Sequence, residues 1–156
     1  MFKAGAAFSR NDYVQAMQWS RKAAAQGNKD AEDCIGYLYE NGYGVPKDYA
    51  EAMKWYRKAA AQGSRGAEYQ IGTLYEYGYG VPKDTAEGMK WLQKAAAQGY
   101  PAADFYIGYL YDTGYGVPKD YAVAMKWYQK AAPHGGLGGN YAKQAIARLQ
   151  AGQTPQ

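Results

Sequence analysis

The sequence is short of the residues from which most catalytic and metal centres are built. Its 156 residues include one cysteine, Cys34, and one histidine, His134. A single cysteine excludes an intrachain disulfide and a thiolate metal cluster, and a lone histidine in a predicted connector over 133–138 is typical of a solvated residue. No HExxH, CxxC, GxSxG or GxGxxG arrangement occurs. We therefore predict no catalytic residue, no metal and no cofactor, and we interpret the protein as not an enzyme.

Long hydrophobic runs and blocks of basic residues are also missing. No apolar stretch approaches the roughly 18–20 residues of a membrane span, and no signal peptide is recognisable. The net charge of +4 comes from 18 basic and 14 acidic residues, which are scattered along the chain. Nucleic-acid binding usually needs a concentrated basic patch. We expect a soluble chain without a nucleic-acid partner or membrane span, located in the cytoplasm or, as a mature form, in the periplasm or outside the cell.

What the chain does contain is one motif repeated several times. Copies start at residues 12, 48, 84 and 120, each with an aspartate, and the period is therefore 36 residues. A methionine and a tryptophan recur in fixed register, at Met17, Met53, Met89 and Met125 and at Trp19, Trp55, Trp91 and Trp127. The block GYGVPKD is unchanged at 42–48, 78–84 and 114–120. A strict period of this length predicts a solenoid with an extended, curved surface.

Each copy is predicted to contain two helices. Asp48 is a favourable N-cap for the first, which we name the B helix; Glu51 completes a possible capping box, and Gly63 ends the helix. The second, the A helix, begins near Arg65. A glycine inside it costs roughly 0.5–1 kcal/mol against alanine, which predicts a close approach of two helix backbones at this position. The glycine is Gly72, with equivalents at Gly36 and Gly108.

The ends of the chain depart from the repeat. We expect one solenoid domain over residues 1–151, with a partial first unit at 1–11, a polar capping helix over about 140–151 and a disordered tail at 152–156. Phe2 and Phe8 in the shortened first helix are expected to cover the neighbouring helix poorly. The protein is therefore expected to be a monomer or a weak dimer through a solenoid end.

The repeated pattern A-x-x-x-I-G-x-L-Y-x-x-G-x-G-V-x-x-D-x-x-x-A-x-x-W-x-x-x-A-A-x-x-G resembles the Sel-one-like repeat (SLR), a branch of the tetratricopeptide clan, from Asp12 to about Ala132. The resemblance implies an all-α, right-handed α/α superhelix. It also implies a scaffold or adaptor for protein–protein or protein–peptide contacts, frequent in bacteria and usually not an enzyme. Cysteine-rich relatives linked to penicillin binding or hydrolysis have disulfide cysteines that this chain lacks.

By the same resemblance, the A helices line the concave face, and positions off their core stripe face a groove. The predicted binding residues are Asp33, Tyr37, Glu40, Asn41, Tyr69, Thr73, Glu76, Tyr77, Phe105, Tyr109, Asp112 and Thr113. Their acidic and aromatic character suits a peptide with lysine or arginine side chains. Replacement of Glu76 and Asp112 by lysine is then expected to abolish peptide capture without unfolding the chain.

Other interpretations of this surface stay open. The carboxylates are also compatible with solvation, and the rings with packing on neighbouring repeats. The groove also suits recognition of a cell-wall fragment or another small ligand, with or without weak hydrolase activity. The uniformity of the repeats is further compatible with a designed or consensus-like scaffold that has no specific ligand.

Overall fold

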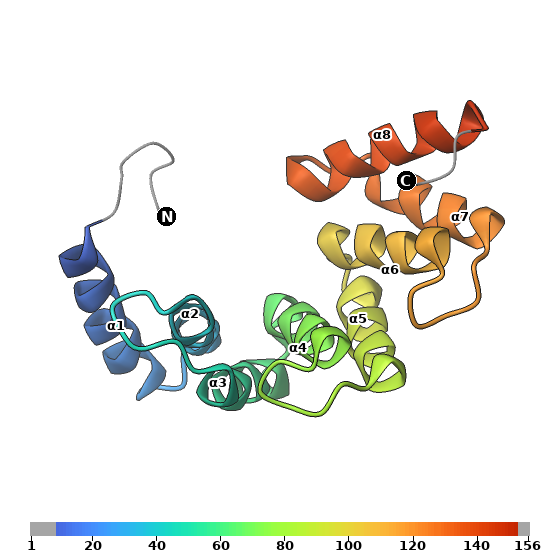
Figure 1. The fold of residues 1–156 in the computed structure, drawn as a ribbon. Coiled ribbons are helices and arrows are strands. Elements are labelled where there is room, and N and C mark those ends of the chain that lie inside the picture. Colours follow the sequence, from blue (N-terminus) through green and yellow to red (C-terminus); the bar gives the residue numbers. More distant parts are fainter. Residues whose placement is uncertain (1–8, 153–156) are drawn as a thin grey trace.

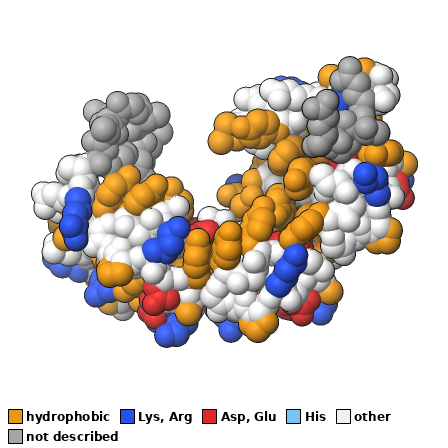
Figure 2. All heavy atoms as spheres, in the orientation of Figure 1, with side chains coloured by type: hydrophobic (Ala, Val, Ile, Leu, Met, Phe, Trp, Pro, Cys, Tyr) orange, Lys and Arg blue, Asp and Glu red, His pale blue; other side chains and the backbone are white. Residues whose placement is uncertain are grey.

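The protein is a row of helical hairpins. The computed structural model describes residues 9–152, and within them eight α-helices and no strand are present. The helices are α1 Arg10–Ala24, α2 Lys29–Asn41, α3 Tyr49–Ala61, α4 Arg65–Tyr77, α5 Thr85–Ala97, α6 Pro101–Thr113, α7 Tyr121–Ala131 and α8 Gly136–Gln150. They follow an arc (Figure 1), and the space-filling view shows that its two arms face each other across a hollow (Figure 2). The all-α solenoid is confirmed, while the predictions for Phe2 and Phe8 lie outside the described residues.

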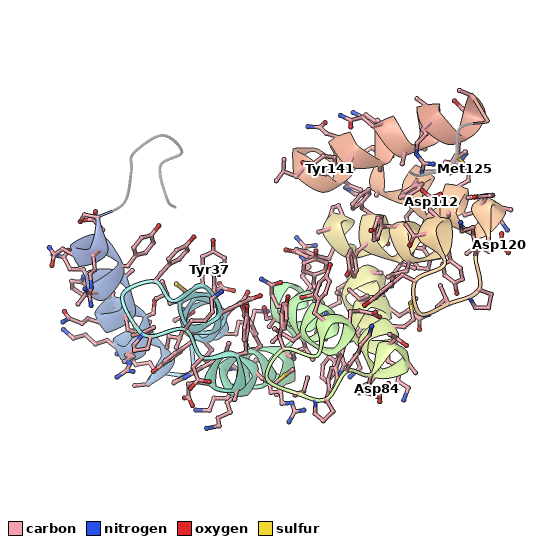
Figure 3. All side chains as sticks on the ribbon, in the orientation of Figure 1. Tyr37, Asp84, Asp112, Asp120, Met125 and Tyr141 are labelled. Carbon is pink, nitrogen blue, oxygen red and sulfur yellow. The ribbon has the colours of Figure 1, made fainter. Side chains whose placement is uncertain are left out.

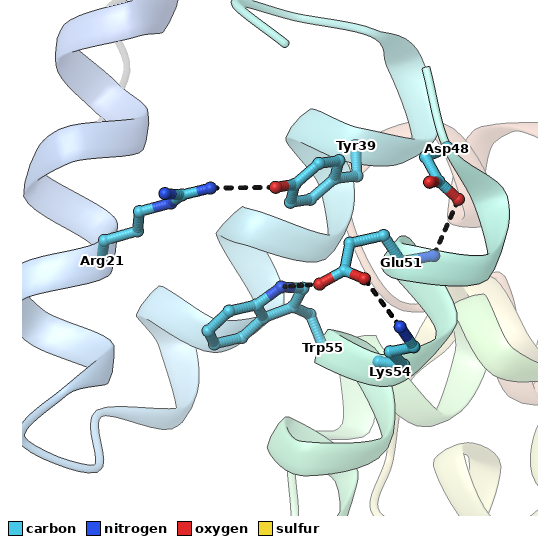
Figure 4. A network of polar contacts seen from close by, with 6 residues as sticks. All are labelled: Arg21, Tyr39, Asp48, Glu51, Lys54 and Trp55. Carbon is cyan, nitrogen blue, oxygen red and sulfur yellow. Dashed lines mark hydrogen bonds and ion pairs between the residues drawn. The ribbon is translucent and has the colours of Figure 1, made fainter. Parts of the chain in front are cut away.

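The start of a B helix shows why the repeated aspartate is needed (Figure 4). The Asp48 side chain accepts a hydrogen bond from the backbone N–H of Glu51 at 2.9 Å, as an N-cap should. The predicted capping box at Glu51 is wrong, because the backbone N–H of Asp48 already donates to the Tyr39 carbonyl at 2.9 Å. The Glu51 carboxylate accepts instead from the Trp55 indole at 3.1 Å and from Lys54 at 3.0 Å.

The first B helix begins differently from the others. Ser9 is the N-cap of α1, and it forms a reciprocal capping box with Asp12: the Ser9 backbone N–H donates to the Asp12 carboxylate at 2.7 Å, and the Asp12 backbone N–H donates to the Ser9 hydroxyl at 3.3 Å. The aspartate that starts this copy in the sequence therefore lies inside the helix, whereas Asp48, Asp84 and Asp120 are true N-caps.

The glycine inside each A helix makes room for the following B helix. A Cβ atom on Gly36 would lie 2.6 Å from the Tyr56 ring, and a Cβ atom on Gly72 would lie 2.7 Å from Leu92 Cγ and 3.0 Å from the Gly88 carbonyl oxygen. Such distances are too short for any side chain to fit without movement. The predicted close approach of two helix backbones is found at Gly72, whereas at Gly36 the glycine makes room for the Tyr56 ring.

The recurring tryptophans pack between repeats, with one exception. Trp55 lies against the buried cluster of Met17, Ile35 and Leu38 in the preceding hairpin, and Trp91 packs in the same way on the cluster before it. Trp19, by contrast, is 69% exposed, so the interpretation of the recurring tryptophan as a core residue is wrong at this position.

The last helix is longer than predicted. α8 begins at Gly136, four residues before the expected start near Asn140, so the irregular connector ends at Gly135. Its first turn lies against α6, where a Cβ atom on Gly138 would be 3.3 Å from the Ala102 Cα atom. Glycine disfavours helix by about 1 kcal/mol, but here its small size permits the contact. Tertiary packing therefore overrides local propensity.

Candidate functional site

The inner surface of the arc is lined by tyrosine rings. α2, α4 and α6 lie along this surface, with the B helices outside them (Figure 1). Tyr37, Tyr77 and Tyr109, one from each of these A helices, are 46%, 50% and 42% exposed. In the space-filling view, hydrophobic side chains gather along the inner edge, and most lysine and arginine side chains lie away from it (Figure 2). We name this surface the inner groove and define it by the exposed faces of α2, α4 and α6.

Tyrosines of the two Gly-rich connectors at 42–48 and 78–84 extend the aromatic surface. Tyr43 stacks on Tyr13 of α1 with ring centroids 4.5 Å apart, and Tyr79 stacks on Tyr49 of α3 at 4.7 Å. Tyr79 also lies 5.5 Å from Tyr77 of the groove. Stacked rings of this kind are worth about 0.5–1.5 kcal/mol beyond their buried area. The connectors are thus held against the B helices, and their rings join those of the A helices.

The gap between α4 and α6 is filled by side chains. Tyr69 lies with its ring centroid 5.4 Å from that of Tyr100 and 6.2 Å from that of Tyr106. The Tyr106 hydroxyl forms a hydrogen bond with the Tyr77 hydroxyl, with the oxygens 3.0 Å apart. Burial raises the pKa of Tyr69 to about 12, so this ring is neutral at physiological pH. Tyr69, predicted as a groove residue, is therefore mainly a packing residue between two A helices.

Phe105 fills the next gap, between α6 and the C-terminal arm. Its ring centroid lies 5.6 Å from that of Tyr128 and 5.8 Å from that of Tyr141. Tyr141 on α8 and Tyr37 on α2 lie on the two opposite arms of the arc (Figure 3). The groove therefore has aromatic side chains along its whole described length.

The prediction that acidic side chains line the groove is wrong for Glu76 and Asp112. Glu76 and Asp112 are each only 1% exposed, because they point between the A helix and the following B helix. Glu40 is partly buried and accepts a hydrogen bond from the Tyr56 hydroxyl at 2.5 Å. Asp112 accepts from the Tyr128 hydroxyl at 2.9 Å and also from Arg148. Lysine at 76 or 112 would bury a positively charged ammonium group in the core without a carboxylate partner at that position. We therefore now expect those substitutions to destabilise the fold.

Three of the predicted polar residues form side-chain hydrogen bonds within their own helices: Asn41, Thr73 and Thr113. The Asn41 amide donates to the Tyr37 carbonyl at 2.9 Å, and the Thr113 hydroxyl donates to the Tyr109 carbonyl at 2.8 Å. Thr73 does the same with the Gln70 carbonyl at 2.9 Å. Their hydrogen-bonding groups are thus engaged within the helix rather than presented to a ligand.

A pocket with a volume of about 570 Å³ opens on the groove between α2 and α4. Four rings and two carboxylates line it, together with small and apolar groups: Tyr13, Asp30, Asp33, Cys34, Tyr37, Leu38, Tyr43, Gly66, Gln70 and Tyr100. Of the predicted residues, it brings together Asp33 and Tyr37. Sequence reasoning missed Tyr13, Tyr43 and Tyr100, although the recurrence of Tyr43 in each GYG block was a usable signal.

Asp33 is the most perturbed carboxylate of the pocket. Burial is the main cause that raises the pKa of Asp33 to about 6; a hydrogen bond from Ser64 opposes the shift, and the nearby charges of Asp30 and Glu40 add to it. The Ser64 hydroxyl donates to Asp33 Oδ2 at 3.3 Å. A Cβ atom on residue 66 would lie 2.8 Å from the same oxygen, so Gly66 leaves the space that this carboxylate occupies.

Within residues 9–152, no group of three or more His, Cys, Asp and Glu side chains is arranged to hold a metal ion. His134 is exposed between α7 and α8, and Cys34 lines the pocket as a free thiol. None of the helices in this range combines the length and the hydrophobicity that a membrane crossing requires.

Comparison with known proteins gives the same architecture. The Sel1 repeat family model matches residues 1–28, 35–64, 66–100 and 101–135. No curated protein sequence matches the chain. Among solved structures, a Sel1 repeat protein from Oxalobacter formigenes superposes with a TM-score of 0.77 at 39% identity, covering 92% of this chain and 57% of its own.

Two further structures are similar. A protective antigen of uropathogenic Escherichia coli with an SLR fold gives a TM-score of 0.78 at 42% identity, covering 91% of this chain and 30% of its own. This chain therefore spans less than two thirds of the length of each of these two relatives. Cysteine-rich protein B of Helicobacter pylori, at 23% identity and a TM-score of 0.62, shares the fold.

The family assignment rests on both sequence and structure. The family model covers most of the chain in four consecutive matches, and the solved relatives stack the same helical hairpins. Sel1 repeat proteins are generally non-catalytic scaffolds. The chain belongs to the Sel1 repeat family.

Proposed function

We propose that this protein is a non-catalytic scaffold that holds a segment of a partner protein in the inner groove. The supporting observation is the row of exposed rings formed by Tyr37, Tyr77 and Tyr109 in three successive repeats, with Tyr37 and Tyr109 at equivalent positions and Tyr77 one helical turn further along α4. The groove is long and open, which suits an extended chain better than a compact metabolite. Family membership supports the same class of function.

Tyrosine is well suited to this role for a physical reason. Its ring provides a large contact area with only two rotatable side-chain bonds, so little conformational entropy is lost on binding. Tyrosine is accordingly enriched at protein interfaces and among the residues that dominate binding energy. Several rings of the groove are also held by stacking, as between Tyr77 and Tyr79, which lowers the cost of ordering them.

The proposal is tested by capture from a native lysate with the immobilised protein and a variant carrying Y37A, Y77A and Y109A. The control is Y121A, which removes an exposed ring at the start of the outer helix α7. Proteins retained by the parent and by the control should be lost from the triple variant. Circular dichroism must show that all three chains are equally helical. Equal capture by the triple variant would contradict a binding role for the groove.

The pocket between α2 and α4 favours a second candidate, recognition of a small ligand such as a cell-wall fragment. Its volume of about 570 Å³ lies within the range of small-molecule sites. A thermal-shift screen with muropeptides and β-lactams tests this candidate. Stabilisation that disappears when the pocket residue Tyr37 is replaced by alanine would support it, and the absence of any shift would count against it.

A further inference from the structure

The pocket between α2 and α4 has a chemical character that the other repeats lack. Its two carboxylates, Asp30 and Asp33, lie one helical turn apart on the same face of α2. The equivalent positions are Gly66 and Tyr69 on α4, and Ala102 and Phe105 on α6. Where the first repeat has an open acidic pocket, the later repeats therefore have aromatic side chains packed into the gap.

The two cations beside these carboxylates, Lys29 and Arg65, form no ion pair with them. Across residues 9–152, neither Asp30 nor Asp33 takes part in an ion pair. Lys29 is near but donates to the Gly63 carbonyl at 3.5 Å, and Arg65 donates to the carbonyls of Gln98 and Gly99, both at 3.2 Å. Both cations are thus directed to the ends of B helices, and the negative charge of the pocket stays available.

The rings of the pocket add a second attraction for positive charge. Tyr13 and Tyr43 are stacked, and the Tyr37 ring is inclined at 60° to that of Tyr43 with centroids 5.9 Å apart. Rings at different inclinations present both faces and edges to the space between them, and a cation over a ring face gains about 0.5–2 kcal/mol. Lysine and arginine also have long apolar stems that can lie along rings while the charged group reaches a carboxylate.

We infer that the pocket between α2 and α4 receives a lysine or arginine side chain of the bound partner. This inference rests on the proposed function, to which it adds the chemistry of one contact. A ligand with an anionic group would meet two carboxylates and be repelled. A neutral apolar group would bury Asp33 further without giving it a counter-charge, which is costly. A guanidinium or ammonium group instead satisfies the carboxylates and the rings together.

The inference is tested with short peptides in place of the unidentified partner. The probes are acetyl-Gly-Arg-Gly-amide and acetyl-Gly-Lys-Gly-amide, and the neutral controls replace the central residue by citrulline or norleucine. Binding is followed by heteronuclear NMR up to millimolar peptide. The cationic peptides should shift backbone amide signals around Asp33 and Gly66 in a saturable way, while the neutral peptides should not.

A double variant and a matched control locate the effect. D30N together with D33N should weaken binding of the cationic peptides about tenfold, because both counter-charges are removed without a change of shape. E87Q, which removes a carboxylate from the outer helix α5, should leave binding unchanged. The inference is overturned if neutral peptides bind equally well, if the double variant binds like the parent, if the shifts lie elsewhere, or if no peptide shifts any signal.

The two proposals can fail separately. If the peptides do not bind but the lysate capture depends on the three groove tyrosines, the scaffold function stands and the cationic contact is wrong. If the peptides bind in the pocket but capture does not depend on the groove, the pocket recognises cations and the scaffold function is wrong. The peptide measurement needs no knowledge of the natural partner.

Discussion

Tyr56 donates its hydroxyl hydrogen to the Glu40 carboxylate at 2.5 Å, across the interface of α2 and α3. Two repeats later, Tyr128 makes the same contact with Asp112. In the middle repeat Leu92 stands at the tyrosine position, and both carboxylate oxygens of Glu76 are buried without a hydrogen-bond partner in the described part of the chain. The carboxylate at this position therefore accepts a hydrogen bond from a tyrosine hydroxyl in the first and third of these repeats, and it has no such donor in the middle one.

The first prediction concerns the stability of the middle repeat. Burial raises the pKa of Glu76 from its ordinary value of 4.5 to about 7. Between these values the folded protein retains a proton that the unfolded chain has released, so stability should fall as the pH rises from about 4.5 to about 7. Glu76→Gln removes this titration. Its advantage over the parent in urea unfolding should be about 1–3 kcal/mol near pH 8 and should shrink near pH 5.

The control for this prediction is Glu87→Gln, which removes a carboxylate that is bound to Trp91 and Lys90 at the surface. This variant should keep the pH profile of the parent. If Glu76→Gln shows the same loss of stability with rising pH as the parent, Glu76 is not the group responsible.

The second prediction transfers the missing hydroxyl to the middle repeat. Leu92→Tyr should donate a hydrogen bond to Glu76, because Leu92 approaches Gly72 as closely as Tyr56 approaches Gly36. We expect a gain of about 1 kcal/mol near neutral pH and a lower pKa for Glu76. Leu92→Phe supplies the ring without the hydroxyl and should give neither effect. Carboxyl-carbon NMR titration measures the pKa, and an unchanged value in Leu92→Tyr would disprove the contact.

The third prediction concerns the attachment of α8. Arg148 on α8 donates to the buried carboxylate of Asp112 on α6, which ties the last helix to the preceding repeat. Arg148→Ala leaves that carboxylate with the Tyr128 hydroxyl alone, and we expect a loss of about 1–3 kcal/mol. Hydrogen exchange of the α8 amides should accelerate. Lys143→Ala, at an exposed position of α8, should not change exchange, and equal protection in both variants would contradict the tie.

The fourth prediction concerns the pH dependence of peptide binding. The Asp33 carboxyl, with a pKa of about 6, should titrate at a lower pH when acetyl-Gly-Arg-Gly-amide occupies the pocket, because a cation favours the charged form. By linkage, affinity should rise as the pH increases through about 6. The charged groups around Asp33 are the carboxylates Asp30 and Glu40, which raise its pKa, and the cations Lys29 and Arg65, which line an adjoining pocket with it. NMR titration of Asp33 with and without peptide measures both quantities. An unchanged pKa in the bound state would contradict direct contact.

Most of the fold could be predicted because its signals are local. Asp48 and Gly63 mark the beginning and end of a B helix through contacts within a few residues, and the apolar stripe between them identifies its buried face. The 36-residue period then requires each hairpin to pack on the next. Predictions were wrong where a contact depends on a residue further away in the sequence. The capping box at Glu51 is an example, because the backbone N–H of Asp48 already donates to the Tyr39 carbonyl.

The candidate site was predicted less completely, because it depends on contacts between residues far apart in the sequence. The tyrosines at 37, 77 and 109 were found because they lie off the core stripe of an A helix, and the structure leaves them exposed. The carboxylates at 76 and 112 were also placed off the core stripe, but whether such a side chain reaches the groove or the following B helix depends on residues 16 positions away, Leu92 and Tyr128. The pocket also needs Tyr100, which comes from the next hairpin.

The order of helices, their caps, their spacing and the assembly into a solenoid follow from the amino-acid pattern, since each depends on hydrogen bonds and hydrophobic contacts between residues close in the chain. The burial of Glu76, the opening of the pocket beside Asp33 and the early start of α8 at Gly136 emerge only when the hairpins are packed together. These features depend on how much space and which polar groups one repeat presents to another. Such complementarity is a property of the packed surfaces and has no local signature.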